Sequence, residues 1–494
     1  MQQVERRMRS EFLVNRDEIL MTQREWADTP LRERVAVIRS LRKRIASDAR
    51  ALAEMVPTRL PGALNRTVAD TLVSEVLPLI EACRFLEREA EKILRGKRLG
   101  SRGRPFWLSG VESTAERVPL GVVLIVGAAN YPLFLAGVQT IQALVAGNAV
   151  LWKPAEGTTA PAFALRVLLI ESGLRPELLT LLEPEVDSAI SAMEAGVDHV
   201  VLTGSAETGK AVMRQLAETL TPATMELSGC DAVFVLPGAD LEHMVRALCF
   251  GLRLNGSCTC MAPRRVFLVG MNDGEASRLE KRLVAALRGL LWVPAPPNSV
   301  DRLRELIADA REQGAEVALD GMAAFEESNV VGVTLISRAA PSMLAMQVDI
   351  FAPVLSVMRT ADVGEALAAN AACPFALTAA VFGPEGDARG LAGKLRVGNV
   401  LVNDLVIPTV DPRIPFGGRG RSGFGVTRGA EGLLAMTAPR TIQVQRSRSK
   451  RPYEPTGDAH VELFAGLVGM LHGSGFGKRL DGLKRLVSAA RKLR

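Results

Sequence analysis

Two hydrophobic patterns divide the chain, one helical and one alternating. Within residues 31–45, apolar side chains recur at every third or fourth position, which predicts a helix with one buried face. For the same reason we expect most of the first hundred residues to be helical. Residues 96–117 break this pattern, because Gly, Arg, Pro and Ser dominate there, and they predict a hairpin outside the helical layer.

From Pro119 onward, short apolar runs alternate with stretches of helical periodicity. The runs fall at residues 121–126, 149–152, 179–182 and 199–202, and the alternation resumes from Arg264 to about Val402. Strands that are apolar along their whole length, separated by helices, are typical of a parallel sheet covered on both faces. We therefore expect an α/β fold of two successive units, with a seam near residues 225–265.

Composition excludes several classes of protein. Hydrophobic residues make up 48% and charged residues 23% of the 494 positions, which is typical of a globular protein and excludes disorder. Six cysteines are too few for a disulfide framework and indicate a reducing compartment. Four histidines without metal-ligand spacing predict no metal site. Aromatic residues, at 4%, are too scarce for a platform that stacks nucleic-acid bases.

The net charge of +6 comes from the tail. Residues 446–494 hold eleven Lys or Arg against four Asp or Glu, a net charge of +7, which leaves −1 for the preceding 445 residues. A nucleic-acid role for the whole chain therefore lacks support. Residues 1–19 are charged and lack the apolar core of a signal peptide, and no apolar run reaches the ~18–20 residues of a spanning helix. We expect a cytoplasmic catalytic body.

Two segments that follow predicted strands could hold a nucleotide. Gly204, Ser205 and Gly209 lie in a turn that opens a helix, where backbone N–H groups suit a phosphate. This turn is not the G-x-G-x-x-G motif, and a purely structural turn is an equal alternative. Lys153 and Glu156 follow another strand, at the sheet edge where ligands bind, and could hold a ribose. A solvated loop with an ion pair is the alternative there.

Two further segments could carry reaction chemistry. Cys258 and Cys260 lie in a Gly/Ser-rich loop before Arg264 and Arg265, and positive surroundings favour a nucleophilic thiolate. A buried small residue is the alternative reading of either thiol. Glu226 lies in an otherwise apolar strand end, where a carboxylate is either exposed or a general base whose pKa is raised by burial.

In their order and spacing these segments resemble the aldehyde dehydrogenase superfamily over roughly residues 20–445. Glu226 lies 34 residues before Cys260, the spacing that the family shows between its base and its nucleophile. The other matching segments are residues 119–132, 146–156, 203–209, 349–354 and 415–423. Residues 402–404 and 422–425 look most like the dimer-forming class 3 branch.

The resemblance implies two interlocked Rossmann-like α/β domains and a β-hairpin oligomerisation element. The expected divisions are an NAD-binding domain (1–97 and 119–227), a catalytic domain (228–438), bridging strands (98–118 and 439–446) and a basic tail (447–494). It also implies a homodimer or a dimer of dimers.

The resemblance also assigns roles to residues. Cys260 would attack the aldehyde, the Asn130 amide and the Cys260 N–H would hold the oxyanion, and Glu226 would activate the hydrolytic water. The residues expected to bind NAD, with NADP as the open alternative, are Lys153, Glu156, Gly204, Ser205, Gly209, Asp349 and Phe351.

The family pattern selects Cys260 over Cys258 as the nucleophile. The family places the nucleophile five residues after an Asn and five before an Arg, and Asn255 and Arg265 meet both conditions for Cys260. Cys258 is then a small filler or a redox partner of Cys260.

Four positions depart from the family pattern. Asp349 replaces a Glu and Ala129 replaces an aromatic residue, while Ser228 and Cys230 alter the stretch after Glu226. These changes leave the nucleophile, base and oxyanion donor in place, and they predict an altered substrate shape.

The predicted function is NAD-dependent oxidation of an apolar aldehyde to its carboxylic acid through a cysteine thioester. A CoA-acylating relative is one alternative, and Glu226 argues against it because only hydrolysis needs a water-activating base. A non-catalytic scaffold that keeps the fold is another. A cysteine hydrolase would need a nearby His, which the sequence does not offer, and it would leave Lys153 and Ser205 unexplained.

The tail adds a separate prediction. Residues 461–471 are apolar but about half as long as a membrane span. Residues 478–494 predict a basic helix with Leu480, Leu483 and Val487 on one face. Such a helix suits peripheral contact with an anionic membrane. Packing on a partner subunit or on an acidic protein is the open alternative.

Overall fold

The computed structural model describes residues 16–58, 66–290, 293–294, 297–323, 325, 330–446 and 456–493. The chain forms two compact units. The first contains residues 1–97 and 115–441, and the second contains residues 98–114 and 442–494.

The first unit contains a six-stranded sheet in the order β19-β7-β6-β3-β4-β5. Its strands are β3 (Val122–Val126), β4 (Ala149–Lys153), β5 (Leu179–Leu181), β6 (His199–Gly204), β7 (Ala223–Leu227) and β19 (Gly423–Phe424). All neighbours are parallel except β19 and β7. The chain runs outward from β3 through β4 to β5, then returns to the other side of β3 through β6 and β7. The point between β3 and β6 where the direction reverses is where open α/β sheets bind ligands.

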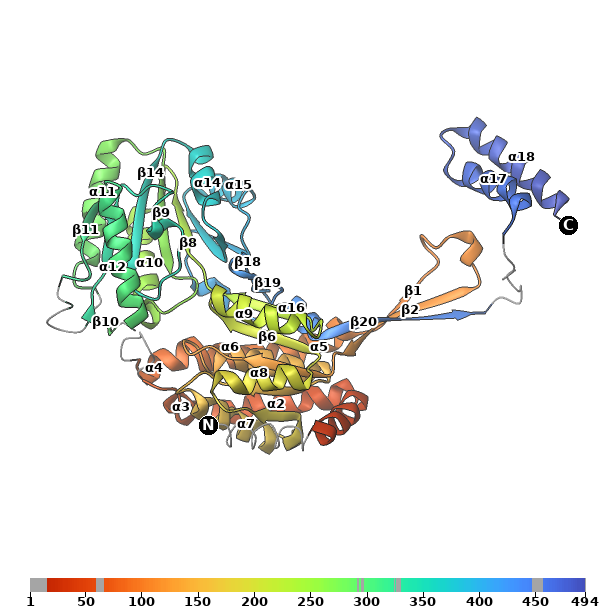
Figure 1. Ribbon diagram of the computed structural model, residues 1–494, viewed down its shortest axis with the longest axis horizontal. Helices are drawn as coiled ribbons and strands as arrows, with labels where there is room; N and C mark the ends of the chain where they lie inside the picture. The colour runs from red at the N-terminus through yellow and green to blue at the C-terminus, as the bar shows by residue number, and fades with distance from the viewer. Residues whose placement is uncertain are drawn as a thin grey trace. The chain divides into compact units, whose positions relative to one another are not determined.

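Helices cover this sheet. They are α2 (Leu31–Ser47), α5 (Leu77–Leu94), α6 (Phe134–Ala146), α7 (Thr159–Glu171), α8 (Val186–Ala195) and α9 (Ala206–Ala217). Helix α6 is buried at nearly every residue because it packs on β3 and β4 and is covered in turn by α2 and α5 (Figure 1). The helical periodicity of the first hundred residues thus corresponds to a layer that shields the sheet.

A second sheet lies in the same unit, with strands in the order β11-β13-β14-β9-β8-β16-β17. The strands are β8 (Asp231–Val235), β9 (Pro263–Val269), β11 (Glu316–Leu319), β13 (Thr334–Ser337), β14 (Val354–Thr360), β16 (Thr378–Phe382) and β17 (Asn399–Val402). Helices α10 (Leu241–Arg253), α11 (Asp273–Leu287), α12 (Pro297–Glu312), α14 (Val363–Ala371) and α15 (Glu385–Ala392) separate them along the chain. Each sheet has its own hydrophobic core. The predicted α/β class is confirmed, with two mainly parallel sheets in the first unit.

The remaining strands and helices come from residues 97–119 and from the C-terminal part of the chain. Strands β1 (Lys97–Leu99), β2 (Val111–Pro119) and β20 (Thr437–Gln445) form a separate three-stranded sheet. Helices α17 (Val461–His472) and α18 (Phe476–Lys492) form an antiparallel hairpin in the second unit (Figure 1). Within the described residues, no helix is long and apolar enough to cross a membrane.

Candidate active site

The loop between α10 and β9 carries the two candidate nucleophiles on a strained turn. Asn255, Gly256 and Ser257 have φ values of 51°, 62° and 66°, and such values are uncommon outside glycine. The buried Arg264 holds this turn. It donates hydrogen bonds to the Ser257 hydroxyl (2.8 Å), the Ser257 carbonyl (2.8 Å) and the Ala352 carbonyl (2.7 Å). One guanidinium therefore links the cysteine loop to the segment that precedes β14.

The two thiols of this loop differ in accessibility. Cys258 is buried and packs against Phe351, while Cys260 is partly exposed. Burial raises the pKa of Cys258 to about 12. Burial, together with the negative charges of Glu226 and Asp231, also raises the pKa of Cys260 well above the usual thiol range. Partial exposure favours Cys260 over the buried Cys258 as the candidate nucleophile.

Asn130 lies beside this loop, just after β3. Its side-chain Nδ2 donates to the Cys258 carbonyl at 3.0 Å, and its own carbonyl accepts from Asn255 Nδ2 at 2.8 Å. The neighbouring Tyr131 hydroxyl forms a 2.8 Å hydrogen bond with the Thr259 hydroxyl. The structure thus brings the predicted oxyanion donor against the loop of the predicted nucleophile, 130 residues further along the chain.

Glu226 is a buried carboxyl on β7, 3% exposed. Its Oε2 accepts a 2.9 Å hydrogen bond from the Thr427 hydroxyl, and its Oε1 has no hydrogen-bond partner in the described part of the chain. Burial raises the pKa of Glu226, while Arg428 and Thr427 partly offset this rise. A buried carboxyl with a raised pKa and a free oxygen is suited to accept a proton.

Arg428 is a site residue that the sequence interpretation missed. It is buried, has a φ of 62°, donates to the Thr409 carbonyl at 2.7 Å and stacks 4.2 Å from the centre of the Phe416 ring. Its charge lowers the pKa of both Glu226 and Cys260. Arg428 follows the segment 422–425 in the sequence, and nothing in that spacing indicates a place at the site. Only the folded loop brings Arg428 beside Glu226 and Cys260.

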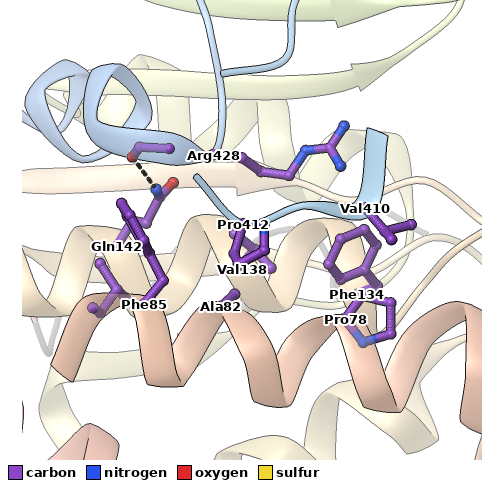
Figure 2. A pocket seen from close by; sticks show the side chains of 11 residues that line it. Pro78, Ala82, Phe85, Phe134, Val138, Gln142, Val410, Pro412 and Arg428 are labelled. Carbon is purple, nitrogen blue, oxygen red and sulfur yellow. Dashed lines mark hydrogen bonds between the residues drawn. The ribbon is translucent and has the colours of Figure 1, made fainter. Parts of the chain in front are cut away.

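A small cavity lies beside Arg428 and Phe134, between α5, α6 and the loop that precedes α16 (Gly429–Ala435). Figure 2 shows its wall, with Gln142 donating a 3.3 Å hydrogen bond to the Gly429 carbonyl. The cavity measures about 10 Å³, room for one water molecule. It is therefore no substrate pocket.

Two polar side chains, those of Trp152 and Lys153, lie at the carboxyl end of β4. Burial lowers the pKa of Lys153, with Glu156 and Glu185 opposing the shift. The indole N–H of Trp152 is buried and lacks a hydrogen-bond partner among the described residues. Gly127 leaves space beside it, since a Cβ there would lie 3.1 Å from the indole nitrogen. Glu156 is exposed beyond the strand end. The predicted ribose ligands Lys153 and Glu156 thus lie at the same strand end, the first buried and the second exposed.

The turn after β6 places Ser205 at the N-cap of α9. The Ser205 hydroxyl accepts from the Thr208 N–H at 3.1 Å, and Gly204 precedes it at the strand end. A Cβ on Gly209 would lie 2.8 Å from the Leu227 side chain. Gly209 thus lets α9 pack closely on β7, which keeps the helix N-terminus beside the switch point of the sheet.

Asp349 and Phe351 lie against the cysteine loop. Asp349 accepts a hydrogen bond from the Ser228 side chain, and burial raises the pKa of Asp349 to about 6 although Arg264 opposes the rise. Its Oδ1 has no partner within the described chain.

A second pair of cysteines lies near the site. The Cys230 thiol forms a hydrogen bond with the Cys373 thiol, and Arg265 donates to the Cys230 carbonyl at 2.8 Å. That hydrogen bond, with Arg265 and Arg421 nearby, lowers the pKa of Cys373. No pattern in the sequence indicates this pair, because the two residues come from different loops.

The chain is similar to known proteins in both sequence and fold. The model of the aldehyde dehydrogenase family matches residues 17–442. The 4,4'-diapolycopene aldehyde oxidase of a Methylomonas species is 29% identical over 460 residues, which cover 91% of this chain and 84% of that protein. The 4,4'-diapolycopene-4,4'-dial dehydrogenase of Cytobacillus firmus is 31% identical, covering 68% of this chain and 75% of its own.

Solved structures show the same fold. The aldehyde dehydrogenase of Mycobacterium tuberculosis, solved in complex with NAD+, superposes with a TM-score of 0.75 at 24% identity over 86% of this chain and 88% of that one. A methylmalonate-semialdehyde dehydrogenase from Oceanimonas doudoroffii superposes with a TM-score of 0.78 at 23% identity, over 87% and 89% of the two chains.

The two α/β sheets, together with the site that contains a cysteine and a carboxylate, therefore define an aldehyde-oxidising type of enzyme. The chain belongs to the aldehyde dehydrogenase family, and the resemblance found in the sequence is confirmed.

Proposed function

We propose that this protein is an NAD-dependent aldehyde dehydrogenase that converts an apolar aldehyde into its carboxylic acid. The observation that carries the proposal is that the loop of the partly exposed Cys260 is bonded by the Asn130 amide, while the buried Glu226 on β7 is close enough to interact electrostatically with Cys260. Catalysis by a thiol, a base and an oxyanion donor needs these three groups together.

In the first step Cys260 attacks the aldehyde carbon after its thiol loses a proton. Glu226, whose pKa is raised and whose Oε1 is free, is suited to take that proton. The negative charge then develops on the aldehyde oxygen. An amide NH₂ has two N–H donors, so Asn130 can keep its bond to the Cys258 carbonyl and offer the second hydrogen to this oxygen, together with the Cys260 N–H.

The cofactor would lie across strand ends of the first sheet and against the segment that precedes β14. Lys153 and Glu156 would hold the adenosine ribose, the N-terminus of α9 at Gly204 and Ser205 would face the pyrophosphate, and Asp349 with Phe351 would hold the nicotinamide end. When bound, NAD supplies the two-electron acceptor that takes the carbon from the aldehyde to the acid level. The Glu156 carboxylate would repel a 2′-phosphate, which favours NAD over NADP.

The second half of the reaction releases the acid. Glu226 would first release the thiol proton to solvent and so return to its carboxylate form. It would then accept a proton from water as the water attacks the thioester, and Cys260 would leave as a thiolate near the positive charge of Arg428. A base for water supports hydrolysis rather than acyl transfer to CoA.

An apolar substrate is supported by the names of two relatives, both of which refer to diapolycopene aldehydes. We further propose a homodimer that uses the three-stranded sheet, because Ile442 and Val444 on β20 are exposed large apolar side chains. A cytoplasmic location is consistent with six free cysteines.

The experiment is a turnover profile of the full chain with NAD against aldehydes of increasing chain length, followed by the absorbance of the reduced cofactor. We expect catalytic efficiency to rise with apolar length, NAD to exceed NADP, and acid to form with or without CoA. An acyl-CoA product would replace hydrolysis with acyl transfer, and no turnover with any aldehyde would leave a non-catalytic scaffold.

A further inference from the structure

The C-terminal hairpin is closed by glycines rather than by interlocking side chains. A Cβ on Gly466 would lie 2.4 Å from the Leu486 backbone nitrogen, and a Cβ on Gly482 would lie 2.2 Å from the Met470 nitrogen. The backbones of α17 and α18 therefore touch directly (Figure 1). Such close contact leaves little room for large side chains between the helices.

Large apolar side chains consequently point outward. Eight of the 24 exposed large apolar side chains in the described chain lie within residues 461–493. They are Val461, Phe464 and Val468 on α17 and Phe476, Leu480, Leu483, Val487 and Leu493 on or just after α18. From Phe476 to Val487 the spacing is four, three and four residues, which places these side chains on one face of α18. Exposed apolar surface of this density indicates an interaction site.

Positive charge borders this apolar face. Helix α18 contains six Lys or Arg and one acidic residue, Asp481. Lys484 and Arg491 line the same surface hollow as Leu483 and Val487. Helical spacing puts Lys484 and Arg491 at the edge of the apolar face, so the two kinds of side chain approach one partner together.

We propose that α17 and α18 dock as a hairpin in the plane of an anionic membrane surface. The apolar face would enter the boundary of the acyl chains while the bordering cations meet phosphate headgroups. Helix α17 has 12 residues, about 18 Å in length, and α18 carries too many charges to insert, so neither helix spans a bilayer of about 30 Å. This proposal does not depend on the proposed aldehyde oxidation, although an enzyme held there would meet apolar aldehydes where they partition.

Flotation of the full chain with vesicles tests the proposal. The vesicles contain phosphatidylcholine alone or with about one-third phosphatidylserine, at low and high salt. We expect flotation only with the anionic vesicles and weaker flotation at high salt. Each cation near the surface contributes about fivefold to binding, so the double variant K484E/R491E should lose at least about tenfold in partition coefficient. The variant L483S/V487S should lose a comparable amount.

The matched control is R278E/K281E on α11, which makes the same charge change at exposed positions of the catalytic body. It should float like the unchanged protein. Turnover of a short, soluble aldehyde should be equal in all variants, so failure of flotation and failure of catalysis are distinguishable. Equal flotation of the hairpin variants, or equal binding to neutral vesicles, would overturn the proposal. Loss of the oligomer in the hairpin variants, with no flotation of the unchanged protein, would instead assign the face to a partner subunit.

Discussion

The side chain of Asn130 donates a 3.0 Å hydrogen bond to the carbonyl of Cys258, two residues before the proposed nucleophile. Asn255 donates to the same carbonyl at 3.3 Å and to the carbonyl of Asn130 at 2.8 Å. The end of β3 and the cysteine loop are thus joined by a closed set of hydrogen bonds. Donors that are fixed before substrate arrives need no reorganisation when charge develops on the substrate oxygen.

The first prediction separates the two thiols of the loop. Cys260→Ala should abolish turnover because the partly exposed thiol forms the bond to the aldehyde, while Cys258→Ala should keep most activity because Cys258 is a buried packing residue. Steady-state production of the reduced cofactor measures both. The reverse result would move the nucleophile to Cys258.

The second prediction concerns the base. Glu226→Gln keeps the shape of the side chain and removes its ability to accept a proton. Because Glu226 is also the proposed acceptor of the thiol proton, Cys260 of this variant loses its proton to solvent and the first half-reaction is slowed. The thioester then persists, so we expect at most about one reduced cofactor per site, formed in a slowed burst and followed by little turnover. Unimpaired steady-state turnover would exclude Glu226 from hydrolysis.

The third prediction concerns Arg428, whose charge lowers the pKa of Glu226 and of Cys260. Arg428→Gln should raise both pKa values. Since both groups must lose a proton to act, the rising limb of the pH–rate profile should move to higher pH, with about tenfold less activity at pH 7 for a shift of one unit. Arg428→Lys keeps the charge and should restore much of the profile. A uniform loss at every pH in both variants would point to packing alone.

The fourth prediction follows from the raised pKa of Asp349, about 6 in the folded protein. An Asp in an unfolded chain ionises near pH 4, so Asp349 favours the folded state below that pH and this contribution is lost as the pH rises through about 6. Asp349→Asn cannot ionise. Its melting temperature should therefore exceed that of the unchanged protein at pH 8, and the gap should narrow at pH 5.

The same variant should bind NAD more weakly, because the free carboxylate oxygen is proposed to meet the ribose. Thermal unfolding at the two pH values and the KM for NAD are the measurements. A stability gap that does not vary with pH would show that ionisation of Asp349 has no part in it.

Sequence patterns predicted the features that depend on local order. The strand ends at Lys153 and Gly204 could be found because apolar runs mark parallel strands and ligands bind at their carboxyl ends. The two α/β units followed from the same alternation. The type of reaction was predicted from the resemblance to a family, which depends in part on the spacing of Glu226 and Cys260.

Features that depend on distant loops could not be predicted in this way. Arg428 reaches the site through a left-handed backbone position and a hydrogen bond to Thr409, and neither leaves a periodic trace in the sequence. The contact of Cys230 with Cys373 likewise depends on how two loops meet. In the tail, the basic helix was predicted from its periodicity, whereas the glycine contact with α17 required both helices in place.

Arg264 bonds to both the turn before Cys258 and the Ala352 carbonyl, and so it sits between the nucleophile loop and the segment of Asp349 and Phe351. A displacement of either segment is passed to the other through one rigid, planar group. The spacing between the cysteine loop and the segment of Asp349 and Phe351 is therefore set, at this contact, by the reach of a single side chain.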